Sequence, residues 1–153
     1  MIDVGPRQRT RMEQINTLDV IRLDIPASYN YLNVLGACVR TFFDVAEGKS
    51  GHSGLAYNVE LAVHEACTNI VEHAYGGIPG RIEIILSLIK EPRRLVVELH
   101  DSGRSFKLSE VTNRDFTEPQ INGYGLFLIY QLMDEIEYLP QSGDNRWYLV
   151  KNL

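Results

Sequence analysis

Residues 60–75 read ELAVHEACTNIVEHAY, and their polar side chains recur at helical spacing. The stretch is rich in helix formers and contains no Gly or Pro, which predicts a helix. Residues three and four positions apart share a helix face, so Glu65 and Asn69 are adjacent, and Glu72 and His73 follow on the next turn. Burial of one side of this helix needs only its apolar positions, Leu61, Ala62, Ala66, Ile70 and Ala74. The polar stripe therefore indicates chemistry.

Two further polar clusters complement the stripe. Asp101 ends an apolar run, and its carboxylate could accept a hydrogen bond from the exocyclic amine of a base; Gly103 lets a flat ring approach the backbone. Gly123 and Gly125 open a predicted helix, whose free N–H groups and positive dipole end suit phosphates. Each cluster alone is common in turns, loops and solvated faces.

Taken together and in this order, the clusters describe a nucleotide site. The amide oxygen of Asn69 is a suitable ligand for Mg²⁺, which prefers oxygen and keeps waters and phosphate oxygens around it. The carboxylate of Glu65, one turn away, could take a proton from an attacking hydroxyl group or water.

Other catalytic motifs fail on spacing. Gly48-Lys49-Ser50 resembles the end of a P-loop, but Phe43 stands where that motif needs a glycine. His64-Glu65 lacks the second histidine of a zinc protease, because position 68 is Thr68. The sequence contains no Gly-x-Ser-x-Gly motif of a serine hydrolase.

The elements that would position these residues follow from periodicity and breakers. A helix capped by Ser28 is expected, then a loop from Gly48 through Gly54, then the 60–75 helix ending at Gly76-Gly77. A long irregular segment, 101–122, precedes the last helix. The expected strands are 18–25, 81–90, 94–100, 135–138 and 147–150, and the expected helices are 28–47, 60–75 and 126–134. This order predicts an α+β fold with helices on one face of a mostly antiparallel sheet.

The composition fits one domain. The 153 residues are 44% hydrophobic and 23% charged, with a net charge of −5, which gives no general attraction for nucleic acid or an anionic membrane. Cys38 and Cys67 are expected as reduced core thiols. Without an apolar run of membrane length or a signal-peptide pattern, we expect a cytoplasmic protein. Residues 1–16 are expected to be loose and 17–153 to form the domain.

These motifs resemble those of a known superfamily. Glu65-Ala-Cys-Thr-Asn69 with Glu72-His73-Ala-Tyr75 is similar to the N-box of the GHKL ATPases, Asp101-x-Gly103-x-x-Phe106 to the G1 box, and residues 123–134 to the G2 box. The anti-sigma-factor serine-protein kinase branch matches best, over residues 21–153. The resemblance implies a Bergerat-type two-layer α/β sandwich with three helices on one face.

Site roles follow from the same resemblance. It implies Glu65 as catalytic base, Asn69 as Mg²⁺ ligand, Asp101 as the reader of adenine, and residues 107–122 as an ATP lid. The other implied nucleotide contacts are Gly103, Phe106, Gly123, Tyr124, Gly125 and Leu126.

The resemblance also implies partners. Members of this family phosphorylate a serine of a small anti-anti-sigma protein of the STAS type, bind a sigma factor, and often form homodimers. The chain departs from the family pattern in two places. Gly143-Asp-Asn-Arg146 lacks the Thr expected near adenine, and the lid holds no obvious lysine for the γ-phosphate, for which Lys107 and Arg114 are candidates.

Alternative functions stay open. A binding module could sequester a sigma factor without catalysis, with or without nucleotide, although it would have no need of a base at Glu65. A stand-alone ATPase is a second alternative. The ATPase half of a histidine kinase is disfavoured, because one strand and one helix fill the space before the 60–75 helix and leave no phospho-accepting hairpin. For His73 we favour a structural role at the helix end.

Overall fold

A computed structural model describes residues 17–48, 53–108 and 124–153 of the chain. The predicted loose segment 1–16 and most of the predicted lid, with Arg114 and Gly123, lie outside the described residues. The elements are β1 (Thr17–Pro26), α2 (Tyr29–Glu47), α3 (Ser53–Asn69), the π-helical turn η1 (Ile70–Tyr75), β2 (Arg81–Ile89), β3 (Arg94–Asp101), α5 (Tyr124–Leu132), β4 (Glu135–Leu139) and β5 (Asn145–Asn152).

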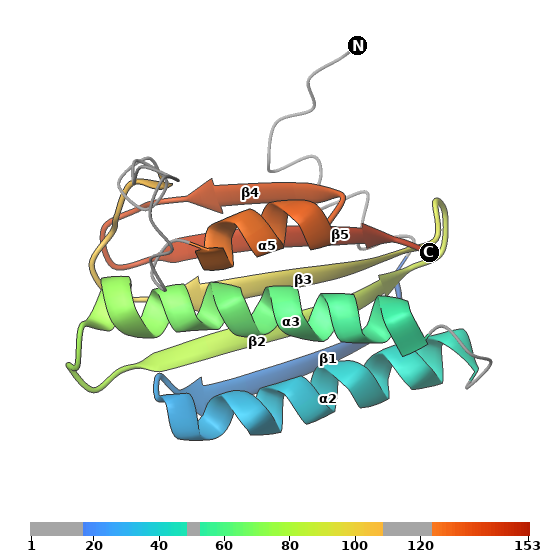
Figure 1. The fold of residues 1–153 in the computed structure, drawn as a ribbon, viewed down its shortest axis with the longest axis horizontal. Coiled ribbons are helices and arrows are strands. Elements are labelled where there is room, and N and C mark those ends of the chain that lie inside the picture. The colour runs from blue at the N-terminus through green and yellow to red at the C-terminus, as the bar shows by residue number, and fades with distance from the viewer. Residues whose placement is uncertain (1–16, 49–52, 109–123) are drawn as a thin grey trace, which may run out of the picture.

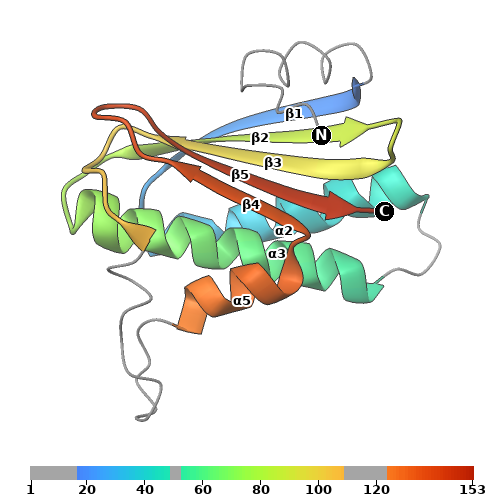
Figure 2. The same cartoon turned by 90° about the horizontal axis from the view of Figure 1, so that it is seen from above.

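The five strands form one sheet in the order β1-β2-β3-β5-β4, and every neighbouring pair is antiparallel. Helices α2, α3 and α5 all lie on one face of this sheet, and α3 lies between the other two (Figures 1 and 2). The predicted two-layer α+β sandwich is confirmed.

The core forms where the helices meet the sheet. Successive side chains of a strand point to opposite faces, and the alternate residues Leu95, Val97 and Leu99 of β3 are at most 1% exposed in this core. Helix α2 contributes an apolar stripe whose residues are spaced mainly by three or four positions. Its buried members are Leu32, Leu35, Gly36, Val39, Phe42 and Phe43.

Helix α3 begins earlier than the sequence predicted. Residues 48–54 were expected to form a loop, but α3 starts at Ser53 and Gly54 lies within it. Ala56 and Val59 are at most 2% exposed and continue the buried face of the helix toward its start. Tertiary packing therefore outweighs the low helix propensity of one glycine.

The predicted end of this helix at Gly76-Gly77 is confirmed, but its last turn is a π-helix. The N–H of Gly76 donates to the carbonyl of Val71, five residues back, at 3.0 Å. Both glycines have positive φ angles, 56° and 90°, which glycine adopts without strain. The wider turn changes the spacing of every side chain from Ile70 onward.

The termini of the other elements differ little from the prediction. The last helix spans Tyr124–Leu132 instead of 126–134. Strand β2 ends one residue earlier than expected, and each of the other strands extends one or two residues beyond an expected bound. Ser28 occupies the N-cap position of α2 with extended backbone, but its side chain makes no capping hydrogen bond. None of the helices in the described part of the chain is long and apolar enough to cross a membrane.

Candidate nucleotide site

Asp101 lies at the end of β3 and is 4% exposed. Its Oδ1 accepts hydrogen bonds from the Gly103 N–H and from Nδ2 of Asn145, both at 2.9 Å, while its buried Oδ2 has no partner among the described residues. Burial raises the pKa of Asp101, and the hydrogen bonds from Asn145 and Gly103 oppose that rise. A fixed carboxylate with one free oxygen is suited to accept a hydrogen bond from a ligand amine.

Asn145 holds this carboxylate in place, and sequence reasoning missed it. Its side chain is fully buried, and Nδ2 also donates to the carbonyl of Gly103 at 3.0 Å. Its Oδ1 accepts from the Ser105 hydroxyl at 2.6 Å and from the Gln141 N–H at 3.2 Å. The sequence held one signal for this role, the departure from the family pattern at Gly143-Asp-Asn-Arg146, which includes Asn145. A buried Asn at the start of a strand needs hydrogen-bond partners for its side-chain amide.

Gly103 joins the strand end to η1. A Cβ at position 103 would lie 2.7 Å from the carbonyl oxygen of Ala74, and the neighbouring Arg104 N–H donates to that oxygen at 2.8 Å. The lack of a side chain at Gly103 therefore permits a close approach between two backbone segments. The predicted contact of Gly103 with a flat ring stays a prediction.

Glu65 lies where α3 packs against α5. A Cβ added to Gly125, in the first turn of α5, would collide with Oε2 of Glu65. The structure thus brings two predicted site residues from distant parts of the sequence into contact. The carboxylate of Glu65 lies against the helix end at which phosphate binding was predicted.

Asn69 is the last residue of α3 and is 7% exposed. Its Nδ2 and the neighbouring Thr68 Oγ1 are buried without a hydrogen-bond partner in the described part of the chain. Unpaired buried polar atoms of this kind are rare in folded proteins and suggest a missing ligand. No group of three or more His, Cys, Asp or Glu residues that could hold a metal ion exists among the described residues. A metal ion at Asn69 would therefore depend on few protein ligands, as Mg²⁺ bound to phosphates does.

The other polar residues of the predicted stripe leave it at η1. Glu72 accepts a hydrogen bond from the Tyr29 hydroxyl at 2.9 Å. The His73 ring packs against Phe106, with 5.5 Å between ring centroids. The packing of His73 in the last turn of η1 agrees with the structural role favoured for it.

Four other predicted contacts occupy different environments. Phe106 is 7% exposed and stacks on Tyr138 with 4.9 Å between centroids, so its ring belongs to the core. Leu126 is 1% exposed, which leaves its backbone as the group able to meet a ligand, whereas Tyr124 is 59% exposed. Lys107 is exposed. Their roles toward a nucleotide stay predictions.

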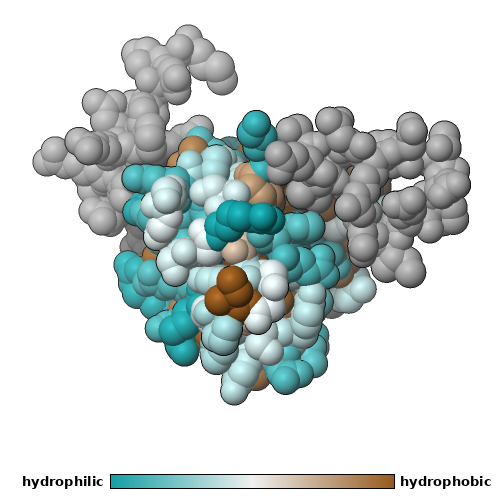
Figure 3. Space-filling model, turned by 90° about the vertical axis from the view of Figure 1, so that its left-hand side faces the viewer, coloured by the Kyte–Doolittle hydropathy of each residue, from teal (hydrophilic) through white to brown (hydrophobic). Residues whose placement is uncertain are grey.

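A polar hollow of about 440 Å³ opens beside the end of β3. It is lined by Asp24, Arg81, Glu83, His100, Asp101, Ser102, Gly143 and Asp144. Its lining reaches Asp101 but includes none of Glu65, Asn69 and Gly125, so it is not the whole of the predicted site. The described surface at this end of the molecule is mainly hydrophilic (Figure 3).

Comparison with known proteins gives the family context of this geometry. Residues 30–150 match the family described as a histidine kinase-like ATPase domain. The serine-protein kinase RsbW of Bacillus mycoides (strain KBAB4) is 33% identical over 135 residues, which cover 80% of this chain and 79% of the relative. RsbW of Bacillus cereus (strain AH187) is 32% identical over the same shares.

Solved structures share the fold. The RsbU and RsbW domains of Rv1364c from Mycobacterium tuberculosis superpose with a TM-score of 0.63 at 20% identity, over 89% of this chain and 32% of that one. The SiaB–SiaC complex from Pseudomonas aeruginosa gives a TM-score of 0.57 at 13% identity, over 99% of this chain and 100% of that one.

Proposed function

Because the chain belongs to the histidine kinase-like ATPase family, among relatives of the RsbW serine-protein kinases, we propose that it transfers a phosphoryl group from ATP to a protein serine. The observation that carries this proposal is the free, buried Oδ2 of Asp101, held by Asn145 next to a π-helical turn. Adenine carries an exocyclic amine that such an oxygen can bind, whereas guanine presents a carbonyl oxygen at the equivalent ring position.

Three groups of this chain would hold the nucleotide. Asp101 would bind the adenine amine, the start of α5 around Gly125 would face the phosphates, and Asn69 would bind Mg²⁺. The ion would supply neutralisation of phosphate charge. The unpaired Oδ2 of Asp101 supports this placement of the adenine, because it lacks a partner within the described protein.

Glu65 would act on the protein substrate. As the serine oxygen bonds to the γ-phosphorus and the bond to the ADP oxygen breaks, the hydroxyl proton would pass to the Glu65 carboxylate. The position of Glu65 against Gly125 supports this role, because it places the base beside the predicted phosphate end of α5.

The proposed protein partners are a small anti-anti-sigma protein of the STAS type as substrate and a sigma factor as the sequestered target. A protein with these partners would act in the cytoplasm. The RsbW names of the relatives and the solved SiaB–SiaC complex support a partner-binding role.

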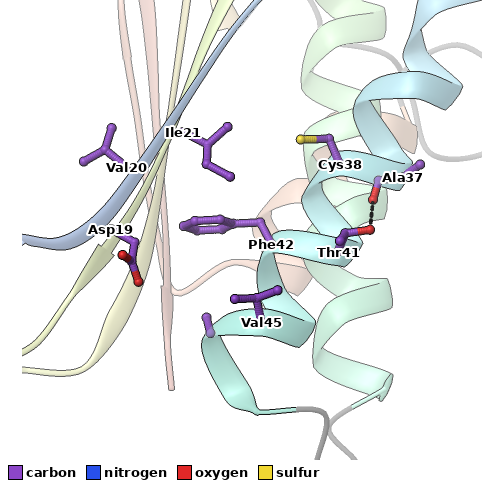
Figure 4. A pocket seen from close by; sticks show the side chains of 9 residues that line it. Asp19, Val20, Ile21, Ala37, Cys38, Thr41, Phe42 and Val45 are labelled. Atoms are coloured by element: carbon purple, nitrogen blue, oxygen red, sulfur yellow. Dashed lines mark hydrogen bonds between the residues drawn. The ribbon is translucent and has the colours of Figure 1, made fainter.

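A homodimer is part of the same proposal. Within the described residues β1 is an edge strand that pairs only with β2, so one row of its backbone groups can meet another strand. An apolar groove of about 550 Å³ opens between β1 and α2, where Ile21, Phe42 and Val45 come together (Figure 4). An edge strand beside an apolar groove favours association with a second copy.

The test is phosphoryl transfer measured by intact mass. The full chain is incubated with Mg-ATP and a STAS-type candidate partner, and we expect one added phosphoryl group on the partner. Glu65→Gln should reduce the rate by about 100-fold or more while ATP still binds. Glu135→Gln, an exposed carboxylate at the start of β4 outside the hollow beside Asp101, should transfer at the natural rate. Phosphoryl transfer by Glu65→Gln at the natural rate would refute the role of Glu65 as the base. A stable complex with the partner, without a phosphoryl group added to the partner, would favour the binding module.

A further inference from the structure

The hydroxyl group of Tyr75, the last residue of η1, joins three segments of the chain. It donates a hydrogen bond to the carbonyl oxygen of Arg81 at 2.6 Å and accepts one from the Ser102 N–H at 3.1 Å. A phenol has a single hydroxyl proton, so the serine is the donor in the 3.4 Å contact between Tyr75 and the Ser102 hydroxyl. The end of η1 is therefore tied both to the start of β2 and to the segment that follows β3.

The ring of Tyr75 is fixed in this position by packing. The side chain is 8% exposed and belongs to the main core. A Cβ added to Gly80 would collide with the ring, so the ring lies directly against the backbone that precedes β2. Because the ring is held between η1 and β2, the hydroxyl group has little freedom to follow a moving partner. Its two backbone partners are thereby held relative to each other.

The backbone of η1 holds the same segment after β3 at two further points. The N–H of Arg104 donates to the carbonyl oxygen of Ala74 at 2.8 Å. Carbonyl groups in the last turn of a helix have no partner within the helix, so this one is available. Gly103 approaches the same carbonyl so closely that a Cβ would not fit. Residues 102–104 are thus held by the last two residues of η1.

We propose that Tyr75 is a positioning residue for adenine recognition, an inference that rests on the proposed function. Asp101 directly precedes Ser102, and its Oδ1 accepts a hydrogen bond from the Gly103 N–H. The direction of its free Oδ2 therefore depends on where the backbone of these three residues lies. Asn145 fixes the carboxylate from the side of β5, and Tyr75 fixes the backbone that carries it from the side of η1.

The same turn begins at the other end of the proposed site. Asn69, the proposed Mg²⁺ ligand, directly precedes η1, and Tyr75 ends this turn of six residues. Turns of π-helix are frequent at functional sites. In the proposed site, η1 sets the spacing between the residue that binds the metal ion and the residue that positions the reader of the base.

The substitution Tyr75→Phe tests this role because it removes the hydroxyl group and keeps the buried ring. The Ser102 N–H loses its acceptor, so its hydrogen exchange, followed by NMR, should become at least about tenfold faster. Titration calorimetry of the full chain with Mg-ATP should show a dissociation constant raised about 5–10-fold at unchanged stoichiometry. A merely structural role would instead lower the fraction of chain able to bind, and with it the stoichiometry. Tyr57→Phe, at a 60% exposed tyrosine, is the matched control and should change neither quantity.

A double-variant cycle separates the adenine contact from other effects. Asp101→Asn already weakens that contact, so adding Tyr75→Phe to it should raise the dissociation constant by less than about twofold. Equal effects of Tyr75→Phe in the two backgrounds would overturn the proposal, and so would an unprotected Ser102 amide in the natural chain. A natural chain that does not bind ATP would overturn the proposed function together with this role. ATP binding by the natural chain with equal affinity in Tyr75→Phe would overturn only the role of Tyr75.

Discussion

The side-chain amide of Asn145 donates a hydrogen bond of 2.9 Å to Oδ1 of Asp101, and both side chains are at most 4% exposed. The contact joins the start of β5 to the end of β3. It occupies one oxygen of the carboxylate and leaves Oδ2 available. The direction in which Asp101 presents its free oxygen is therefore set by a residue that need not touch a ligand.

Asn145→Ala should weaken both stability and ATP binding. The substitution leaves Oδ1 of Asp101 with one donor fewer and removes the partner of the Ser105 hydroxyl. We expect a loss of about 2–3 kcal/mol in the free energy of unfolding, measured by urea denaturation. Asn152→Ala, on the same strand but exposed, is the matched control and should change stability by less than about 0.5 kcal/mol. A loss no larger than that of the control would show that the Asn145 contacts are not important for the fold.

The pH dependence of stability should change in Asp101→Asn. Burial raises the pKa of Asp101, so its contribution to stability is complete below the ordinary aspartate value of about 3.9 and is lost as the pH rises through the folded pKa. Asparagine does not ionise and avoids this loss. The free energy of unfolding of the variant, relative to the natural chain, should therefore increase from about pH 4 to pH 7.

Asp144→Asn should change the pH dependence of stability in the opposite direction. The hydrogen bond from Arg146 lowers the pKa of Asp144, so the contribution of this carboxyl is present above the ordinary value and is lost as the pH falls through the folded pKa. The relative stability of this variant should fall slightly with rising pH, and the effect should be small because the pair is exposed to solvent. Parallel pH profiles for the two variants would contradict the assignment at Asp101.

Gly125→Ala should separate folding from activity. The added Cβ meets Oε2 of Glu65, the end of a flexible side chain, so the carboxylate moves and the helices stay packed. We expect unchanged or slightly higher stability and at least a tenfold slower phosphoryl transfer. Gly54→Ala, a helical glycine with open space around its Cβ position, should stabilise by about 0.5–1 kcal/mol and leave transfer unchanged. Phosphoryl transfer at the natural rate in Gly125→Ala would show that the reaction does not depend on the position of the Glu65 carboxylate.

Gly103→Ala should destabilise the protein. Its Cβ would lie 2.7 Å from a backbone oxygen at Ala74, which cannot move as a side chain can. A loss of about 1–3 kcal/mol is expected from thermal or urea unfolding. Retention of full stability would mean that η1 shifts freely against the end of β3.

The sheet and most helices could be predicted because local patterns and tertiary packing agree there. Apolar-rich runs predicted β2 and β3, and the glycine pair after Tyr75 predicted the helix end. The start of α3 could not be predicted, since burial of Ala56 and Val59 by the rest of the fold outweighs the local signal of Gly54.

Only part of the site could be predicted from the sequence, for two physical reasons. The π-helical turn changes the spacing of side chains after Asn69, so Glu72 and His73 leave the stripe on which a regular helix would place them. Asn145 looks like an ordinary turn residue in the sequence. Its role appears only when β5 pairs with β3 and brings it opposite Asp101.

Titration calorimetry with the full chain, Mg²⁺ and either ATP or GTP tests the adenine-triphosphate pocket most directly. The free oxygen of Asp101 should accept the adenine amine, so ATP should bind in preference to GTP, and Asp101→Asn should lose about 10–100-fold in ATP affinity while remaining folded. Absence of ATP binding by the natural chain, or equal ATP affinity in Asp101→Asn, would contradict the account.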